Sequence, residues 1–287
     1  MQKPTRTAIA TITGTLFSVV GIPVAHADEA QECPEVEIVV ARGTTEGDIG
    51  PQRYGSTVSN GFEGEVLARL FRFLEQRHGE ALFDDVAITG IADTAYRAEP
   101  VLPDEVVEPD DMDERVENAW DLIVRYGPIP MIIEPAIEFV RSVFDGVNTI
   151  PTAMENQDQE TGCSSQTILV GYSQGAMVLQ SYEKQLADQG RLVGALMIGD
   201  PQLKMGQANA GQPQHSGGLF GGSALAPQQV APRYEYCKRN DFVCDTSAEV
   251  IPGIDVHLSY FDPETVRDAD EKATADMLAQ WVEGAKS

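Results

Sequence analysis

The chain has 287 residues and a formal net charge of −25, with 20 Lys and Arg residues against 45 Asp and Glu residues. This acidic balance argues against binding to nucleic acid or to an anionic membrane surface, because both need clustered basic side chains. The apolar content of 42% is that of an ordinary globular protein, so one or two folded domains with a real core are expected.

The first 27 residues are typical of a secretory signal peptide. Lys3 and Arg6 form a short basic end, the stretch 8–20 is mostly small or apolar, and residues 25–27 give an A-x-A cleavage motif. A membrane anchor is the alternative, but the apolar stretch is too short and too rich in Thr, Gly and Ser to span about 30 Å of hydrocarbon. We expect export, a mature domain over 28–287, and no integral membrane segment.

Short apolar strands alternate with amphipathic helices along the mature chain. This alternation predicts an α/β fold, in which a central parallel sheet carries helices on both faces. Asn60 and Glu63 fit a capping box at the start of the first helix. The predicted strands are 36–40, 86–88, 167–170 and 194–198, and the predicted helical segments are 62–74, 175–188 and 263–281.

Two stretches interrupt the alternation. Residues 99–117 are strongly acidic, which indicates a solvated loop rather than a calcium site, because the D-x-D-x-D-G order is absent. Residues 205–232 are rich in Gly, Gln, Pro and Ala and predict a long exposed loop.

Between these stretches, four apolar residues recur at helical spacing: Ile133, Ile137, Val140 and Phe144. Such a face is typical of a helix that packs on its own core. The alternative hypothesis is a cap or lid that borders a lipid site.

The chemistry concentrates in the G-x-S-x-G motif of residues 171–175, which follows an apolar strand directly and precedes a helix. A serine at this place sits on a strained turn above the carboxyl ends of the strands, and the flanking glycines let other backbone approach closely. The motif alone also occurs in ordinary small-residue turns. Its strand–turn–helix context favours Ser173 as a nucleophile.

A nucleophilic serine needs a base, and in triads of this kind the chain order is Ser, then Asp or Glu, then His. His78 precedes the serine, and His215 lies in the Gly-rich loop. His257 lies downstream of every candidate acid, so the chain order selects it as the base.

The acid must lie between Ser173 and His257. Asp241 stands out because Cys237 and Cys244 bracket it, so that a disulfide there would hold the carboxylate rigidly. Asp200, which follows the predicted strand 194–198, is the alternative.

Four cysteines lie in the mature part: Cys33, Cys163, Cys237 and Cys244. An even number in an exported chain indicates two disulfides, and three pairings are possible. A zinc site is disfavoured because no C-x-x-C pair or neighbouring His is present.

Three motifs in this order, together with the segment around His257, resemble the cutinase family of secreted serine esterases, in particular the cutinase-like proteins of mycolate-containing bacteria. The motifs are ARGTTE at 41–46, GYSQGA at 171–176 and CKRNDFVC at 237–244. The Cys-x-x-x-Asp-x-x-Cys element is the most specific of them.

The resemblance implies a compact α/β-hydrolase fold with Ser173 as nucleophile, His257 as base and Asp241 as the acid that orients it. It implies an oxyanion site from Thr44 and the backbone N–H of Gln174, and it requires no metal or organic cofactor. It also implies that Cys33 pairs with Cys163 and Cys237 with Cys244.

The chain departs from the family in one long connection, which predicts an insertion near 104–148. We predict a secreted, monomeric carboxylic-ester hydrolase of cutinase type that acts on acyl esters, polyesters or envelope lipids. An acyltransferase or thioesterase with the same triad is the alternative. A non-catalytic surface protein is a third hypothesis, and the intact set of Ser173, Asp241 and His257 speaks against it.

Overall fold

The computed structural model describes residues 33–100, 118, 134–211, 216–221, 230, 232–265 and 268–286. Within them, six strands form one sheet in the order β4-β1-β5-β6-β8-β7, and each neighbouring pair is parallel. The predicted α/β class with a central parallel sheet is therefore confirmed. The strands are β1 Val36–Ala41, β4 Val86–Gly90, β5 Gln166–Tyr172, β6 Leu192–Ile198, β7 Ala210–Gly211 and β8 Arg233–Cys237. A separate two-stranded ribbon joins β2 Arg53–Tyr54 to β3 Thr57–Val58.

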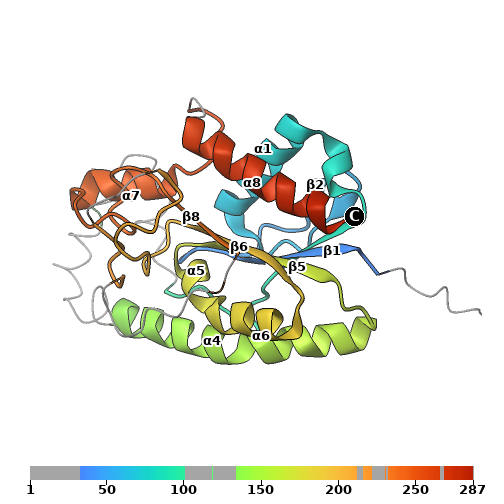
Figure 1. Cartoon of the computed structure of the whole chain (residues 1–287). Helices are drawn as coiled ribbons and strands as arrows, with labels where there is room; N and C mark the ends of the chain where they lie inside the picture. The colour runs from blue at the N-terminus through green and yellow to red at the C-terminus, as the bar shows by residue number, and fades with distance from the viewer. Residues whose placement is uncertain are drawn as a thin grey trace, which may run out of the picture. The chain divides into compact units, whose positions relative to one another are not determined.

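Helices cover both faces of the sheet (Figure 1). One face carries α1 Gly64–His78, the short 3-10 helix η1 Glu80–Phe83 and α8 Ala269–Ala285. The other face carries α4 Glu134–Thr161, α5 Gln174–Val178 and α6 Gln180–Gln189. A further helix, α7 Val250–Leu258, lies at the carboxyl ends of the strands.

The strands look almost uniformly apolar because each of their faces is buried. In β1, for example, Ile38 and Val40 pack with α1 and α8, whereas Val39 and Ala41 pack on the side of α4 and α6. The alternation of side chains along each strand thus feeds two separate hydrophobic cores, one above and one below the sheet.

The predicted start of the first helix is wrong in detail. Helix α1 begins at Gly64, and its N-cap residue Glu63 makes no side-chain cap hydrogen bond. The amide of Asn60 is instead used at the end of β4, where it donates to the carbonyl oxygen of Gly90 and accepts from its N–H, both at 2.8 Å. The last helix also begins later than predicted, because Asp268 caps it by accepting from the N–H of Glu271 at 2.7 Å.

The predicted insertion falls largely outside the described residues. Of the range 104–148, only Asn118 and residues 134–148 are described, and the latter form the first half of α4. This helix packs on the core through Ser142, Gly146, Ile150 and Met154. The interpretation of the apolar face as core is wrong, since Ile137, Val140 and Phe144 are 54%, 65% and 68% exposed. Ile133 lies outside the described residues.

The predicted long loop 205–232 is described at 205–211, 216–221, 230 and 232, and it is more structured than expected. It contains strand β7. The segment 216–221 is fixed by backbone hydrogen bonds, in which Gly218 donates to Leu203, Leu219 to Val243 and Phe220 to Pro201, at 2.7 to 3.0 Å. Among the described residues, no helix is long and apolar enough to cross a membrane.

Candidate active site

Ser173 occupies the sharp turn between β5 and α5. Its backbone angles are φ 54° and ψ −121°, a conformation that is strained for any residue with a side chain. A Cβ on Gly175 would lie 2.0 Å from the carbonyl oxygen of Ala41, and one on Gly171 would lie 2.6 Å from Ala176 Cα. The two motif glycines are therefore required by the close approach of β1 and of the following helix.

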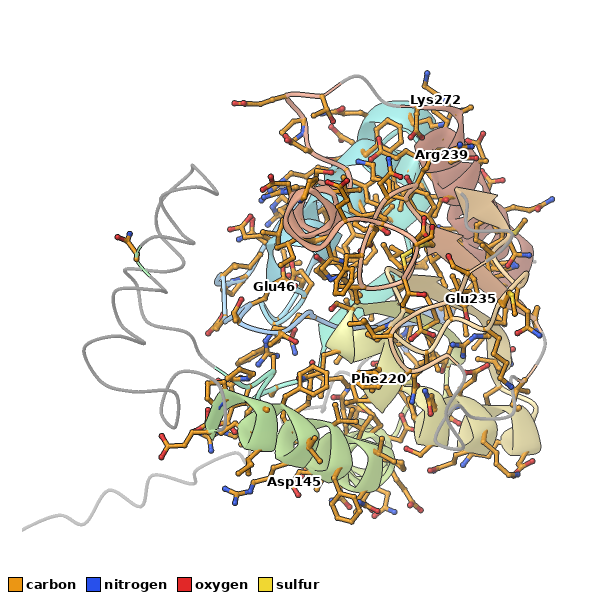
Figure 2. The ribbon with its side chains drawn as sticks, turned by 90° about the vertical axis from the view of Figure 1, so that its left-hand side faces the viewer. Glu46, Asp145, Phe220, Glu235, Arg239 and Lys272 are labelled. Carbon is orange, nitrogen blue, oxygen red and sulfur yellow. A yellow bond between two sulfur atoms is a disulfide. The ribbon has the colours of Figure 1, made fainter. Side chains whose placement is uncertain are left out.

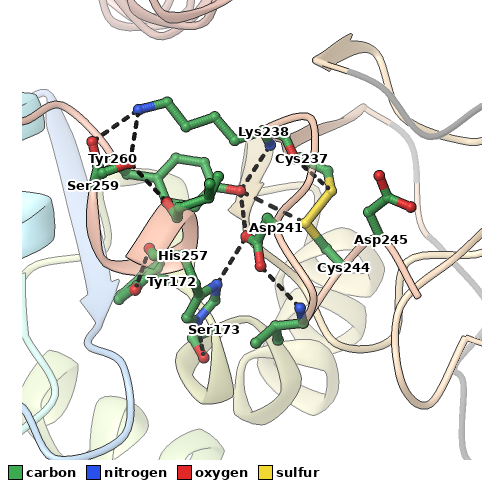
Figure 3. A network of polar contacts seen from close by, with 12 residues as sticks. Tyr172, Ser173, Cys237, Lys238, Asp241, Cys244, Asp245, His257, Ser259 and Tyr260 are labelled. Carbon is green, nitrogen blue, oxygen red and sulfur yellow. Dashed lines mark hydrogen bonds and ion pairs between the residues drawn. A yellow bond between two sulfur atoms is a disulfide. The ribbon is translucent and has the colours of Figure 1, made fainter. Parts of the chain in front are cut away.

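The side chains of Ser173, His257 and Asp241 form one hydrogen-bonded row (Figure 3). His257 Nε2 lies 2.9 Å from Ser173 Oγ, and His257 Nδ1 lies 2.8 Å from Asp241 Oδ2. Asp241 is fully buried, whereas Ser173 and His257 keep 8% and 7% exposure. This arrangement can pass a proton from the hydroxyl to the imidazole while the carboxylate holds the ring in place.

Asp241 is held by groups other than the histidine. The Tyr260 hydroxyl donates to Oδ2 at 2.7 Å, and the N–H of Val243 donates to Oδ1 at 2.9 Å. Burial raises the pKa of Tyr260 well above its ordinary value, and the charge of Asp241 raises it further. The tyrosine therefore keeps its proton and remains a donor, while its oxygen accepts from the N–H of Lys238 at 2.8 Å.

The imidazole of His257 is packed on two sides. The ring of Tyr172 stacks on it with centroids 5.0 Å apart, and the Tyr172 hydroxyl donates to the carbonyl oxygen of His257 at 2.8 Å. Gly199 lies against another part of the ring, since a Cβ at this position would be 2.8 Å from His257 Cε1. The ring is therefore confined by packing as well as by its hydrogen bonds.

The loop after β1 lies beside the serine turn, because β1 and β5 are neighbours in the sheet. Arg42 is fully buried and donates to the carbonyl oxygens of Glu46, Ile91 and Tyr96 and to the carboxylate of Asp93. The carboxylate of Glu46 accepts from the N–H groups of Gly43 at 2.7 Å and Val66 at 2.9 Å, and burial raises its pKa. These contacts hold the backbone on both sides of Thr44.

The side chain of Gln174 is anchored to α4 and to the segment after β4. Its amide oxygen accepts from the hydroxyls of Tyr96 at 2.8 Å and Ser142 at 3.1 Å, and its Nε2 donates to the carbonyl oxygen of Glu99 at 2.8 Å. Gln174 is fully buried. Helix α4 thus supports the residue that follows the serine, and the amide side chain itself is occupied.

The alternative acid and bases lie elsewhere. Asp200 accepts from the N–H of Gln202 and pairs with Arg233. His78 pairs with Asp276 at 3.0 Å, and His215 lies outside the described residues. Within the described part of the chain, no three His, Cys, Asp or Glu side chains are grouped so as to hold a metal ion.

Both disulfides form as the resemblance implies. Cys33 pairs with Cys163 over a Cα–Cα distance of 5.4 Å, and Cys237 pairs with Cys244 over 5.9 Å. The first joins the segment just before β1 to the segment just after α4, and the second closes the short loop that contains Asp241. Two disulfides are consistent with an oxidising, extracellular environment.

Sequence reasoning missed the residues that support the row rather than form it. Tyr260 and Gly199 carry no motif of their own, and Tyr172 occupies a variable position of G-x-S-x-G. Gln174 was expected to act through its backbone N–H, and the contacts of its side chain were missed. Ser142 lies in α4, a helix for which the sequence predicted only an apolar face. These residues support the row because segments that are distant in the chain lie side by side in the fold. No local sequence pattern therefore predicts the contacts.

The cutinase family model matches residues 139–273, a range that contains all three side chains of the row. Over this range the chain matches the cutinase family. A match to this family indicates a serine esterase, that is, a carboxylic ester hydrolase.

Several solved structures are similar to this chain. A cutinase-like protein from Cryptococcus sp. is 18% identical, with 89% of this chain and 97% of that chain covered and a TM-score of 0.44. The catalytic core of acetyl xylan esterase from Trichoderma reesei is 20% identical, with 88% and 100% covered and a TM-score of 0.48. Lysin B from Mycobacteriophage D29 is 14% identical, with 88% and 90% covered and a TM-score of 0.41. No curated protein matches the chain in sequence.

Proposed function

We propose that the protein hydrolyses carboxylic esters through Ser173 as nucleophile, His257 as base and Asp241 as the acid that orients the base. The observation that carries the proposal is the row of two hydrogen bonds, 2.9 Å from Ser173 to His257 and 2.8 Å from His257 to Asp241. The strained conformation of Ser173 supports it further, because strain of this kind concentrates at functional residues.

The reaction proceeds in two halves. Ser173 Oγ attacks the carbonyl carbon of the ester while His257 Nε2 takes its proton, and the protonated imidazole then gives that proton to the departing alcohol. Water attacks the acyl-enzyme in the same way and releases the acid. The oxyanion of each tetrahedral intermediate is bound by Thr44 and by the backbone N–H of Gln174, and one such donor lowers the barrier by about 3 kcal/mol.

The substrates proposed are acyl esters, including polyesters and envelope lipids. We further propose that residues 1–27 are a signal peptide and that the protein is secreted, in keeping with its two disulfides. Residues 1–27 lie outside the described residues.

The test is a pair of variants assayed on p-nitrophenyl acetate. Ser173→Ala and His257→Ala should each lower kcat/KM about 10⁴-fold while the protein stays folded. A fluorophosphonate probe should label the wild-type protein at Ser173 and leave Ser173→Ala unlabelled. An alcohol added to the assay distinguishes hydrolysis from acyl transfer by its product.

Two matched controls keep the test specific. Ser56 is an exposed serine that donates to Asp84, and His78 is the histidine paired with Asp276. Ser56→Ala and His78→Ala should keep nearly full activity. Near-normal turnover by folded His257→Ala would contradict the proposed base.

A further inference from the structure

Two aromatic rings from distant parts of the chain, one on α4 and one in the segment 216–221, pack against each other. Phe139 lies in the first turns of α4, and Phe220 lies in the fixed segment 216–221. Their ring centroids are 6.2 Å apart with an angle of 33° between the planes. Figure 2, which views the molecule from the side where α7 lies, places Phe220 just above α4.

On the α4 side, Phe139 is linked to the residue that follows the nucleophile. Phe139 precedes Ser142 by one helical turn, so the two side chains share a side of the helix about 4.5 Å apart along its axis. The Ser142 hydroxyl donates to Gln174 Oε1 at 3.1 Å, and Gln174 follows Ser173 directly. Phe139 therefore lies one turn beyond the contact between α4 and the serine turn.

On the other side, Phe220 is linked to the shell around the histidine. Its N–H donates to the carbonyl oxygen of Pro201 at 2.7 Å. Pro201 is two residues after Gly199, which lies against the imidazole of His257. The neighbouring Leu219 donates to the carbonyl oxygen of Val243, whose own N–H donates to Asp241. The aromatic pair thus joins the serine side of the row to its histidine and aspartate side.

We propose that Phe139 and Phe220 form an apolar wall that binds the acyl chain of the ester and sets the preference for acyl length. The proposal rests on the function proposed above. The wall is open to solvent, since Phe220 is 37% exposed and Leu219 beside it is 44% exposed. The contacts of Phe139 lead toward Ser173, and those of Phe220 lead toward His257 and Asp241. An acyl chain whose carbonyl carbon is attached to Ser173 therefore has an apolar surface next to it.

The size of the effect follows from burial of methylene groups. Full removal of one methylene from water favours binding about fourfold, and contact with a wall on one side gives about half of that free energy, or about twofold per methylene. An acyl chain with several methylenes against the wall should therefore gain about tenfold in kcat/KM over acetate. The contact persists in the transition state, so the gain appears in kcat/KM.

The experiment compares p-nitrophenyl acetate with p-nitrophenyl octanoate in Phe139→Ser, Phe220→Ser and the double variant. Each single substitution should lower kcat/KM for octanoate about tenfold and change that for acetate less than about twofold. Because the two rings form one surface, the double variant should lose less than the product of the single losses. Titration with a fluorophosphonate counts the competent sites, so that rates refer to folded enzyme.

Phe144→Ser is the matched control. Phe144 lies on the same helix and is 68% exposed, but it is five residues from Phe139 and so points about 140° away around the helix. This variant should leave the ratio of octanoate to acetate rates unchanged. Phe139→Leu and Phe220→Leu, which keep an apolar side chain, should retain most of the octanoate rate.

The failures of the wall and of the proposed function are distinguishable. An octanoate-to-acetate ratio that stays unchanged in folded Phe139→Ser and Phe220→Ser would overturn the wall while the triad stands. Equal losses on both esters that track a lower melting temperature would also overturn it, since they would show a structural role. Acetate turnover that survives Ser173→Ala would instead overturn the proposed function.

Discussion

At the scale of single residues, Gly199 provides the space that the imidazole of His257 occupies. Its φ of 58° lies in the left-handed region, and a Cβ would lie 2.8 Å from His257 Cε1 and 3.1 Å from Nδ1. A real Cβ essentially never lies as close as 2.8 Å to another atom, so a side chain here would displace a ring that is already confined by Tyr172. The lack of a side chain at Gly199 therefore leaves the space that the imidazole of His257 occupies.

We expect Gly199→Ala to lower kcat about a hundredfold, because a displacement of about 1 Å in a reacting group has an effect of this size. Gly190→Ala is the control. Gly190 has a φ of 70° and nothing within 4 Å of its Cβ position, so it carries the backbone strain without the clash. Backbone strain should lower the unfolding free energy of both variants by about 1–3 kcal/mol, but only Gly199→Ala should lose activity. Similar activity in the two variants would show that the clash is relieved elsewhere.

At the scale of elements, the two disulfides act on different properties. The Cys33–Cys163 bond closes a loop with a sequence separation of 130, whereas the Cys237–Cys244 separation is 7. On the chain-entropy model the long loop contributes about 5 kcal/mol of stability and the short loop about 2.5 kcal/mol. The short loop, however, contains Asp241, so its bond constrains the orientation of the histidine.

Removing each disulfide separately should distinguish its effect on stability from its effect on catalysis. Cys237→Ala with Cys244→Ala should lose most of its activity and melt only modestly earlier than the wild-type protein. Cys33→Ala with Cys163→Ala should melt much earlier and, when assayed well below its melting temperature, keep more of its turnover. A fully active variant without the short bond would show that Tyr260 and Val243 suffice to hold Asp241.

A buried ionic cluster joins α6, the end of β6 and β8. Arg233 pairs with Glu183, Asp200 and Glu235, and all four side chains are at most 5% exposed. One guanidinium cannot neutralise three carboxylates, and burial raises the pKa of Glu183 and Asp200 and raises that of Glu235 from 4.5 to about 8. The charges of Asp200 and Glu183 add to the rise at Glu235, and Arg233 opposes it.

This cluster predicts that stability falls as pH rises from about 4.5 to about 8, the two pKa values of Glu235. In that window the folded protein holds a proton that the unfolded chain has released, so unfolding becomes easier by up to about 1.4 kcal/mol per pH unit. Urea denaturation should show a weaker decline in Glu235→Gln, whose neutral amide imitates the protonated acid. Glu80→Gln, at an exposed carboxylate, is the control for net charge. Parallel declines in Glu235→Gln and the wild type would exclude Glu235 as the cause.

At the scale of the whole molecule, the net charge of −25 makes the folded chain repel itself. Raising the ionic strength from about 0.01 M to about 0.15 M shortens the Debye length from about 30 Å to about 8 Å. We therefore expect the melting temperature at pH 8 to rise by several degrees over this range, and to rise less near pH 4.5, where carboxylates take up protons. A fall with added salt would mean that attractive pairs such as Arg77–Asp276 outweigh the repulsion.

The sequence by itself determined the fold class, the serine turn and the chain order of the row. These features are local, since a strand buried on both faces must be apolar throughout, as in β1 and β5. A strained turn between strand and helix needs small residues on each side, and the two glycines of G-x-S-x-G provide them.

The tertiary structure alone decided what happens where distant segments meet. Strand β8 reads Arg-Tyr-Glu-Tyr-Cys and escaped prediction, because its Arg233 and Glu235 are buried only through partners on α6 and after β6. The sequence favoured Asp241 over Asp200 through its flanking cysteines, and the fold adds the contacts of each: Asp241 lies 2.8 Å from His257 Nδ1, whereas Asp200 pairs with Arg233. Likewise, the helical spacing of apolar residues predicts an apolar face on a helix but not what that face packs against. Phe144 was therefore expected in the core, whereas its side chain is exposed in the fold. For β8 and for the apolar face of α4, the outcome depends on which distant segments of the chain meet, and no spacing along the chain encodes that.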